Sequence, residues 1–313
     1  MAVHIPLLHR MDAVTYTIYR YTIPYHKPFW TRSGLLLRLL SEGKERSGEI
    51  APLPGRSKET LVEALTQLSQ VLKTKQMPSK LYPSVSFGLY CAFSAPSLTH
   101  PLPLSALLVG TAKQILKRAE TAYAQGYRSA KVKVSGMDLS STASLLKELS
   151  SHFSLRVDAN RAFSYSEALL LCERGNAHLW EYIEEPTYEE EKLAAFPYPF
   201  ALDESLCLER AAALPCAALI LKPTLIGGYD ECFSYAKLGK KCILSSACET
   251  AIGLLGIGAL ATALSIETPL GLDTYRFGQK DVLQTPLDFS RAECVALKNL
   301  SVDWTLLEEV AHE

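Results

Sequence analysis

Two lysines lie two residues apart in a short apolar run, at positions 131 and 133 of the segment AKVKVSG (130–136). Because side chains alternate between the two faces of a β-strand, both ammonium groups should point the same way. Burying like charges side by side costs free energy. Such crowding also lowers the pKa of a lysine, so the spacing predicts an amine that can act as a base.

Carboxylates end the next three predicted strands: Asp158 in RVDAN (156–160), Glu184 in LWEYIEE (179–185) and Asp203 in FALDES (200–205). One acid at a strand end is often a helix N-cap, a role that Glu185, Glu204 and Ser205 also fit. Two carboxylates about 4 Å apart repel each other by roughly 4 kcal/mol at an effective dielectric of 20, so three together need a cation. An all-oxygen set open to substrate favours Mg²⁺ over zinc, with Mn²⁺ as a substitute.

Lys222 ends the following predicted strand, so Lys133 and Lys222 should lie on either side of the metal. A divalent ion between two lysines suits abstraction of a proton next to a substrate carboxylate, because the metal stabilises the enediolate that forms. Lys131 and the metal would both lower the pKa of Lys133 and help to make it the base.

The elements that must hold these residues alternate between short apolar strands and helices from about residue 103 onward. Such alternation implies parallel strands, and this many units predict a (β/α) barrel, whose chemistry lies at the carboxyl ends of the strands. The alternative is an open doubly wound sheet, but no strand leads into a G-x-G-x-x-G turn. The candidate strands are 105–110, 129–134, 154–159, 179–185, 200–205, 217–223, 241–246 and 269–274.

The first hundred residues have a different pattern, with strands followed by helices, which predicts a small α+β domain. We therefore expect an N-terminal domain over 1–100 and a barrel over 101–282, with the segment 283–313 packing back on the first domain. The expected elements are a strand at 14–23, a hairpin around SEGKER (41–46), and helices at 58–73, 84–95 and 291–300.

Composition excludes several classes of protein. The formal net charge is -1 and no cluster of Lys and Arg resembles a nucleic-acid footprint. The most apolar segment, 251–266, is shorter than the roughly 20 residues that span a bilayer, so a buried helix is expected and no membrane partner. The eight cysteines include no C-x-x-C pair, which indicates reduced thiols in a cytoplasmic protein and no structural zinc.

The order of these motifs resembles the muconate-lactonizing subgroup of the enolase superfamily. The motifs KVK, VDAN, IEEP, LDES and LKP follow one another as in that subgroup, and the resemblance covers nearly the whole chain. It implies a modified TIM barrel closed by an N-terminal α+β capping domain. It also implies that Lys133 is the base with Lys131 as its partner, that Lys222 stabilises the enediolate, and that Asp158, Glu184 and Asp203 hold Mg²⁺.

Within the subgroup the chain is most similar to the o-succinylbenzoate synthase family, in segments such as SGEIAPLPGRSKET, LKPTLIGG and SSACETAIG. The similarity implies syn dehydration of a small-molecule substrate, 2-succinyl-6-hydroxy-2,4-cyclohexadiene-1-carboxylate, in menaquinone biosynthesis. The expected substrate contacts, for which strand-end hydrogen bonding is the alternative, are Asn160, Arg156, Ser245, Ser246 and Gly271.

Some positions depart from the family pattern or stay open. Phe163 stands where relatives often carry Trp, and the loop from Pro24 to Trp30 has no signature. Thr31 and Arg32 either face the substrate or lie on the surface.

Other functions remain as alternatives. An N-acylamino acid racemase needs no new catalytic group. A dipeptide epimerase tends to carry Asp-x-Asp on the eighth strand, where this chain has only Asp273. A non-catalytic barrel scaffold would leave much charge uncompensated. The sequence carries no signal for an oligomeric state.

Overall fold

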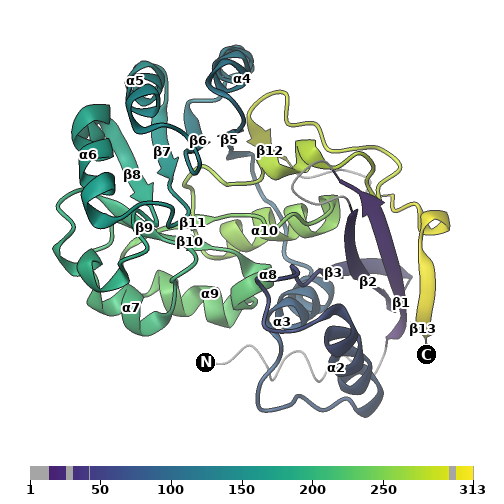
Figure 1. Ribbon diagram of the computed structural model, residues 1–313. Coiled ribbons are helices and arrows are strands. Elements are labelled where there is room, and N and C mark those ends of the chain that lie inside the picture. The colour runs from purple at the N-terminus through teal and green to yellow at the C-terminus, as the bar shows by residue number, and fades with distance from the viewer. Residues whose placement is uncertain (1–13, 26–30, 42, 296–300, 313) are drawn as a thin grey trace.

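The structure is a computed structural model that describes residues 14–25, 31–41, 43–295 and 301–312. An antiparallel sheet with two helices lies beside a curled parallel sheet, and helices cover the outer face of the parallel sheet (Figure 1). This arrangement agrees with the predicted barrel and N-terminal α+β domain.

The antiparallel sheet has the strand order β13–β1–β2–β3. β1 pairs with β2 along its whole length, and β2 and β3 form the hairpin expected around SEGKER, with Ser41 opposite Lys44. β13 comes from the far end of the chain and pairs with β1, so the C-terminal segment lies on the N-terminal sheet (Figure 1). The strands are β1 (Thr15–Pro24), β2 (Thr31–Ser41), β3 (Lys44–Ile50) and β13 (Glu308–His312).

Two helices pack on this sheet. α2 (Leu61–Thr74) begins at a capping box between Thr60 and Glu63, which satisfies backbone N–H groups that the first turn leaves free. α3 (Pro83–Leu89) begins at a proline, whose fixed φ suits the first helical position, and continues as the π-helical turn η1 (Tyr90–Ser94). The helices predicted at 58–73 and 84–95 are therefore present, with shifted starts.

The parallel sheet has seven strands in the order β11–β10–β9–β8–β7–β6–β5, which is the order of the chain. Two of these strands, Phe200–Leu202 and Ala218–Leu221, are buried at every residue, as expected for strands covered on both faces. The strands are β5 (Ser105–Leu108), β6 (Ser129–Lys133), β7 (Ser154–Asp158), β8 (Trp180–Glu184), β9 (Phe200–Leu202), β10 (Ala218–Leu221) and β11 (Lys241–Leu244).

Helices follow most of these strands and form the outer layer (Figure 1). The α-helices are α4 (Ala112–Ala124), α5 (Leu139–Ser150), α6 (Tyr165–Gly175), α7 (Leu208–Ala213), α8 (Pro223–Ile226), α9 (Tyr229–Ala236) and α10 (Ala251–Ala263). Short 3-10 turns are η2 (Ala177–Leu179), η3 (Glu190–Ala195), η4 (Asp273–Phe277) and η5 (Trp304–Leu306).

The eighth predicted strand, 269–274, is reduced to two bridging residues. Leu270 bridges Leu104 beside β5, and Gly271 bridges Ser245 just after β11. The Gly271 N–H donates to the Leu244 carbonyl at 2.9 Å, and the Ser105 N–H donates to the Leu270 carbonyl at 2.9 Å. This segment therefore joins the two edges of the curled sheet.

The helix predicted over 291–300 is wrong in its described part. Glu293–Cys294 forms the short strand β12, which pairs with β4 (Leu102–Pro103), and residues 296–300 lie outside the described residues. Buried and exposed residues alternate from 291 to 295, which is the period of a strand. Pairing with β4 therefore outweighs the helical propensity of the segment.

The apolar segment 251–266 contains α10, which ends at Ala263 and lies between the barrel and the N-terminal sheet (Figure 1). The N-cap residue Thr250 does not cap α10 with its own side chain. Glu49 of β3 does so from the other unit, accepting from the Thr250 N–H at 3.0 Å and the Gly253 N–H at 2.8 Å. A carboxylate at a helix N-terminus is stabilising, so this contact ties the two units together.

Gly48 marks the closest approach between β3 and α3. A Cβ added at Gly48 would lie 2.0 Å from the Gly88 carbonyl oxygen, and backbone cannot move aside as a flexible side chain can. We expect Gly48→Ala to destabilise the fold by about 1–3 kcal/mol through overpacking. Urea unfolding measures this, with the exposed Lys44→Ala as the control on the same strand. Equal stability of the two variants would contradict the close packing.

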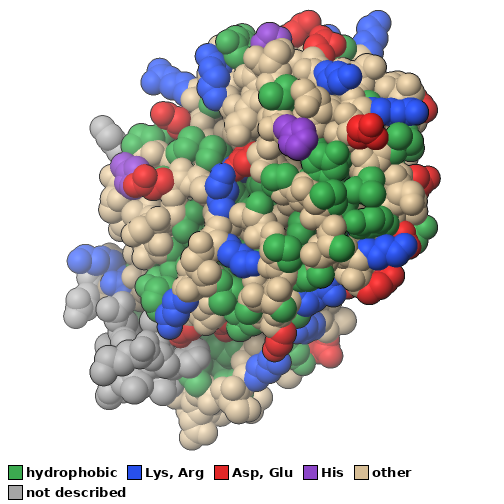
Figure 2. Space-filling view, turned by 90° about the vertical axis from the view of Figure 1, so that its left-hand side faces the viewer, with side chains coloured by type: hydrophobic (Ala, Val, Ile, Leu, Met, Phe, Trp, Pro, Cys, Tyr) green, Lys and Arg blue, Asp and Glu red, His purple; other side chains and the backbone are tan. Residues whose placement is uncertain are grey.

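Charge on the visible surface is mixed. On the face shown in Figure 2, Lys and Arg side chains are interspersed with Asp and Glu. Among the described residues, no helix has the length and apolar character needed to cross a membrane. All eight cysteines are free thiols, as predicted.

Candidate active site

The carboxyl ends of β6, β7 and β8 bring three predicted residues into register. Lys133 of β6 is opposite Asp158 of β7, and Asp158 is opposite Glu184 of β8. Asp203 follows β9, the next strand in the sheet, and Lys222 follows β10. The two lysines therefore stand on either side of the three acidic strands.

Ammonium groups neutralise the carboxylates. Lys131 Nζ lies 2.9 Å from Asp158 Oδ2 and 2.7 Å from Glu184 Oε1. Lys222 Nζ lies 2.5 Å from Asp203 Oδ2. Lys133 makes a longer contact, 3.4 Å to Asp158 Oδ2, and 42% of its side chain is exposed. Lys133 is thus the least constrained of the three amines.

Burial and charge shift the pKa values in this cluster. Burial, together with the charge of Asp158, raises the pKa of Glu184 to about 8. Burial acts in the same direction on Asp203, but Lys222, Lys131 and Arg56 together outweigh it and lower the pKa of Asp203 to about 2. Burial would lower the pKa of Lys131, yet Asp158 and Glu184 hold it well above the usual value. Lys131 is therefore a permanent cation in this arrangement.

The same carboxylates form an all-oxygen donor set. In the part of the chain that the structure describes, no three Asp, Glu, His or Cys side chains are arranged to hold a metal ion, and Lys131 and Lys222 lie against the carboxylates instead. Glu184 Oε2 is buried and has no hydrogen-bond partner among the described residues. Such an oxygen is costly to leave unpaired, so the donor set fits a hard divalent cation once the lysines shift.

A cavity of about 810 Å³ opens above the cluster. Its wall contains the three lysines and Glu184, and loops of the N-terminal unit at Leu53–Arg56 cover it from the other side. All five predicted substrate contacts line this cavity: Asn160, Arg156, Ser245, Ser246 and Gly271.

The polar groups of these five residues already have protein partners. The Ser245 hydroxyl donates to the Gly271 carbonyl at 3.2 Å, and the Ser246 hydroxyl bonds to the Thr274 hydroxyl. Arg156 is buried, with Nε 2.7 Å from Glu181 Oε2 and an N–H that donates to the Pro269 carbonyl at 2.7 Å. Strand-end hydrogen bonding therefore accounts for these groups, and their contact with a substrate stays a prediction.

The residues proposed as helix N-caps have other roles. Glu185 Oε1 accepts from the backbone N–H groups of Asp203 and Ser205, each at 2.8 Å, and so fixes the turn after β9. α7 instead begins after Cys207, which makes no side-chain cap. Glu204 lines the cavity and faces Asn160 and Arg56.

Arg32 is neither a surface residue nor part of the cavity wall. It is 2% exposed and donates to the carbonyls of Cys248 at 3.1 Å and Pro52 at 2.9 Å. It also donates to the Ala51 carbonyl. Arg32 therefore joins two loops that line the cavity, one from each unit. Residues 26–30 of the loop from Pro24 to Trp30 lie outside the described residues.

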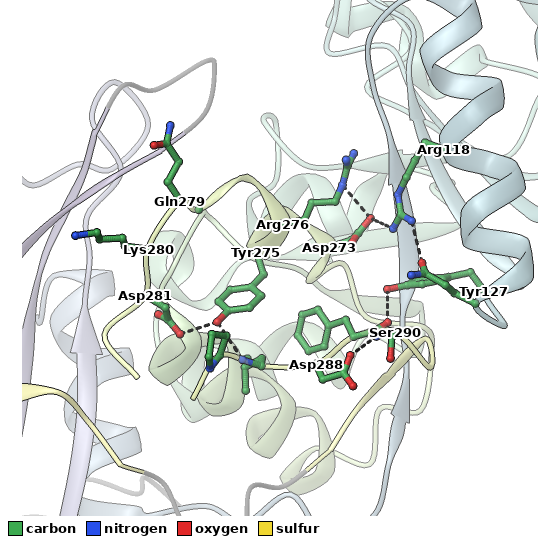
Figure 3. A pocket seen from close by; sticks show the side chains of 15 residues that line it. Arg118, Tyr127, Asp273, Tyr275, Arg276, Gln279, Lys280, Asp281, Asp288 and Ser290 are labelled. Carbon is green, nitrogen blue, oxygen red and sulfur yellow. Dashed lines mark hydrogen bonds and ion pairs between the residues drawn. The ribbon is translucent and has the colours of Figure 1, made fainter. Parts of the chain in front are cut away.

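Asp273, at the end of the eighth predicted strand, is fully engaged (Figure 3). Its Oδ2 lies 2.9 Å from Arg118 and 3.3 Å from Arg276, and it accepts from the Leu107 N–H at 2.7 Å. Two guanidinium groups and one carboxylate leave this corner with a net positive charge. A substrate ammonium group would therefore compete with two guanidinium groups for Asp273.

Sequence reasoning missed Arg56, Glu204 and the partners of Asp273. Arg56 stands in the quoted segment APLPGRS, but nothing in its neighbours indicates that it reaches Glu204 across the cavity. Arg118 lies on α4, far along the chain from Asp273. Only the fold brings these pairs together.

Two family models match the chain. A model described as "MenC, N-terminal domain" matches residues 13–95, and one described as "Enolase C-terminal domain-like" matches residues 114–295. The o-succinylbenzoate synthase of Edwardsiella ictaluri is 33% identical over 300 residues, which cover 86% of this chain and 92% of the relative.

Solved structures are also similar to this chain. The o-succinylbenzoate synthase of Thermosynechococcus elongatus, solved with Mg in its active site, is 25% identical with a TM-score of 0.69, covering 88% of this chain and 97% of that one. The L-Ala-D/L-Glu epimerase of Bacillus subtilis is 18% identical with a TM-score of 0.75, covering 92% of this chain and 95% of that one. At that identity the epimerase shares the fold alone. The predicted fold class is confirmed.

Proposed function

Because the chain belongs to the o-succinylbenzoate synthase family of the enolase superfamily, we propose that it is a Mg²⁺-dependent hydro-lyase. Its reaction is the syn dehydration of 2-succinyl-6-hydroxy-2,4-cyclohexadiene-1-carboxylate to 2-succinylbenzoate, in cytoplasmic menaquinone biosynthesis. The observation that carries the proposal is the position of Lys133 and Lys222 on either side of Asp158, Glu184 and Asp203.

The charges of the cluster suit a substrate with two carboxylates. Three formal negative charges face three positive ones, so a divalent cation and a dianionic substrate can enter together without leaving net charge in the cavity. Asp158, Glu184 and Asp203 would hold Mg²⁺. When bound, Mg²⁺ supplies Lewis-acid stabilisation of the charge that develops on the ring carboxylate of the substrate.

Lys133 is the proposed base. Its amine faces the cavity, makes only one long ion-pair contact, and so can approach the α-carbon of a bound substrate. It takes the α-proton as a neutral amine. Its conjugate acid then gives a proton to the departing hydroxyl on the same face, which accounts for syn stereochemistry and returns Lys133 to its starting state.

Lys222 and Lys131 act as cations that stay charged. Asp203 raises the pKa of Lys222 even though burial opposes this, so Lys222 stays charged and stabilises the enediolate from the opposite side of the substrate. Lys131 contacts Asp158 and Glu184 and holds both side chains in place, and against the opposing effect of burial its charge helps to lower the pKa of Asp158.

Racemisation of N-acylamino acids is a second candidate, because two lysines on opposite sides of the substrate can exchange a proton across both faces. Dipeptide epimerisation has less support, since Asp273 is already ion-paired with Arg118 and Arg276 (Figure 3). A scaffold without catalysis is disfavoured by the cost of keeping six charged groups together without a function.

An ultraviolet assay of the purified protein tests the proposal. With Mg²⁺ and the cyclohexadiene substrate, the aromatic product should form, and the reaction should stop when a chelator is added. A panel of N-succinylamino acids, followed by polarimetry, tests racemisation in parallel. Racemisation without dehydration would reject the proposed function in favour of the second candidate.

Binding of Mg²⁺ should raise the unfolding temperature. At a concentration 100 times the Kd, a ligand stabilises the folded state by about 2.7 kcal/mol, which corresponds to roughly 5 °C for a large domain. Differential scanning calorimetry should find this shift in the parent protein and in Asp288→Asn, an exposed control. Asp203→Asn should lose it. A shift retained in Asp203→Asn would exclude Asp203 as a ligand.

A further inference from the structure

We propose that Glu204 and Arg56 position Lys133 through the side-chain amide of Asn160, so that the N-terminal unit helps to orient the base. This inference rests on the proposed function. It assigns Glu204 and Arg56 as positioning residues, which do not themselves contact the reacting atoms.

Four side chains form one continuous series of contacts. Lys133 Nζ donates to Asn160 Oδ1 at 3.2 Å, and Asn160 Nδ2 donates to Glu204 Oε1 at 3.1 Å. Arg56, from the N-terminal unit, donates to the same Glu204 oxygen at 2.6 Å. The series therefore runs from the base to the other side of the cavity.

The direction of each hydrogen bond follows from the carboxylate. Glu204, ion-paired with Arg56, offers only acceptor atoms, so the NH₂ group of Asn160 must face it. The amide oxygen of Asn160 must then face Lys133, and Lys133 must donate. A neutral Lys133 amine that donates a hydrogen bond to Asn160 Oδ1 keeps its lone pair free to accept the substrate proton. A reversed amide would donate to that lone pair and block the base.

Other contacts hold the amide at this position. Asn160 has a left-handed backbone with φ 46°, a conformation that asparagine tolerates better than most residues. Its N–H donates to Asp158 Oδ1 at 3.1 Å. The backbone is therefore fixed to the strand end, and only the orientation of the amide remains to be set by its partners.

A hydrogen-bonded turn holds Arg56 on the N-terminal side of the cavity. The Arg56 N–H donates to the Leu53 carbonyl at 3.0 Å, and the Leu53 N–H donates to the Ser57 hydroxyl at 2.8 Å. Arg32 binds the Pro52 carbonyl just before this turn and the Cys248 carbonyl across the domain boundary. The guanidinium of Arg56 is thus presented to Glu204 by a segment tied to the barrel.

The ion pair between Arg56 and Glu204 contributes little to the stability of the fold, because 40% of the Arg56 side chain is exposed to solvent. Glu204 Oε2 is also buried without a hydrogen-bond partner among the described residues, which stability alone does not favour. A role in orientation explains why the carboxylate is retained. It also predicts effects on turnover without effects on folding.

Glu204→Gln tests the inference, because glutamine keeps the shape but can present either a donor or an acceptor to Asn160. We expect kcat to fall about 10- to 100-fold, as for a misplaced catalytic group, with KM and the Mg²⁺-induced thermal shift nearly unchanged. Glu209→Gln, an exposed residue nearby, should match the parent protein. Unchanged kcat in Glu204→Gln would overturn the inference.

Arg56, the other partner of Glu204, gives a second test. Its guanidinium also lies 3.8 Å from Asp203 Oδ2, so the Mg²⁺-induced thermal shift is measured in the same variants. Arg56→Ala should lower kcat by a smaller factor than Glu204→Gln, and Arg56→Lys should recover most of the loss because a cation remains. Lys58→Ala, an exposed cation two residues away, is the matched control. A KM effect without a kcat effect in Arg56→Ala would indicate substrate binding and contradict positioning.

A readout that needs no turnover separates this inference from the proposed function. The side-chain NH₂ signals of Asn160, assigned with Asn160→Asp, should shift and exchange faster with solvent in Glu204→Gln. Unchanged Asn160 signals would overturn the inference even if dehydration occurs. Absence of dehydration in the parent protein, with shifted Asn160 signals, would reject the function and keep the hydrogen-bond series.

Discussion

Lys133→Ala is expected to lower turnover by at least about 10³-fold, at the upper end of the range for loss of a general base. With the amine gone, the α-proton loses its proposed acceptor. Lys133 contacts Asp158 at 3.4 Å and is partly exposed, so its removal should leave the fold and the Mg²⁺-induced thermal shift intact.

The matched control is Lys133→Arg, which keeps a positive charge but cannot take a proton at working pH. Both variants should lose turnover equally if Lys133 is the base, whereas only Lys133→Ala should lose it if Lys133 is an electrostatic group. Steady-state assays of the ultraviolet change measure this. Full activity in either variant would remove Lys133 from the proton-transfer step.

Lys222→Ala should lower kcat by about 10²- to 10³-fold, the usual cost of removing one preorganised stabiliser of a developing anion. Lys222 lies 2.5 Å from Asp203, and both are enclosed at the strand ends. The loss should fall mainly on kcat, because the charge that Lys222 stabilises is larger in the transition state than in the bound substrate.

Lys222→Arg separates charge from shape, since it keeps a cation in a larger side chain. We expect it to retain more activity than Lys222→Ala, with the Mg²⁺-induced thermal shift present in both. A variant that loses the thermal shift would show that Lys222 acts by organising Asp203. An unchanged rate in Lys222→Ala would exclude Lys222 from the mechanism.

The residues at the strand ends could be predicted from sequence because successive strands of this parallel sheet are neighbours, so residues that follow one another in the chain lie side by side. Lys133, Asp158 and Glu184 end their strands. Asp203 and Lys222 directly follow theirs, and parallel strands end at one rim. The period of two within a strand then selects the face. Assignment of roles to these residues stays a prediction, as do the domain boundaries at 100 and 282.

The other features of the site and fold depend on contacts between distant segments, which local sequence patterns do not indicate. The buried Arg32 is recognised only when Cys248 and Pro52 are beside it. Glu204 resembles a helix N-cap until Arg56 and Asn160 are placed against it. The helical propensity of 291–300 was misleading because Cys294 pairs with Leu102 in β12 and β4.

Lys131 has a role that its spacing from Lys133 did not indicate. In the structure it contacts two carboxylates and is the counter-ion of Asp158 and Glu184. The tuning of Lys133 by Lys131 stays a prediction.

The pairing of β13 with β1 has a consequence for how the protein is made. β1 leaves the ribosome before the barrel strands, and its edge partner β13 leaves after them. Throughout synthesis of the barrel, the backbone groups along that edge have no strand beside them, which favours association with other chains. Nascent protein lacking residues 308–312 should therefore depend on chaperones more than the full-length chain does.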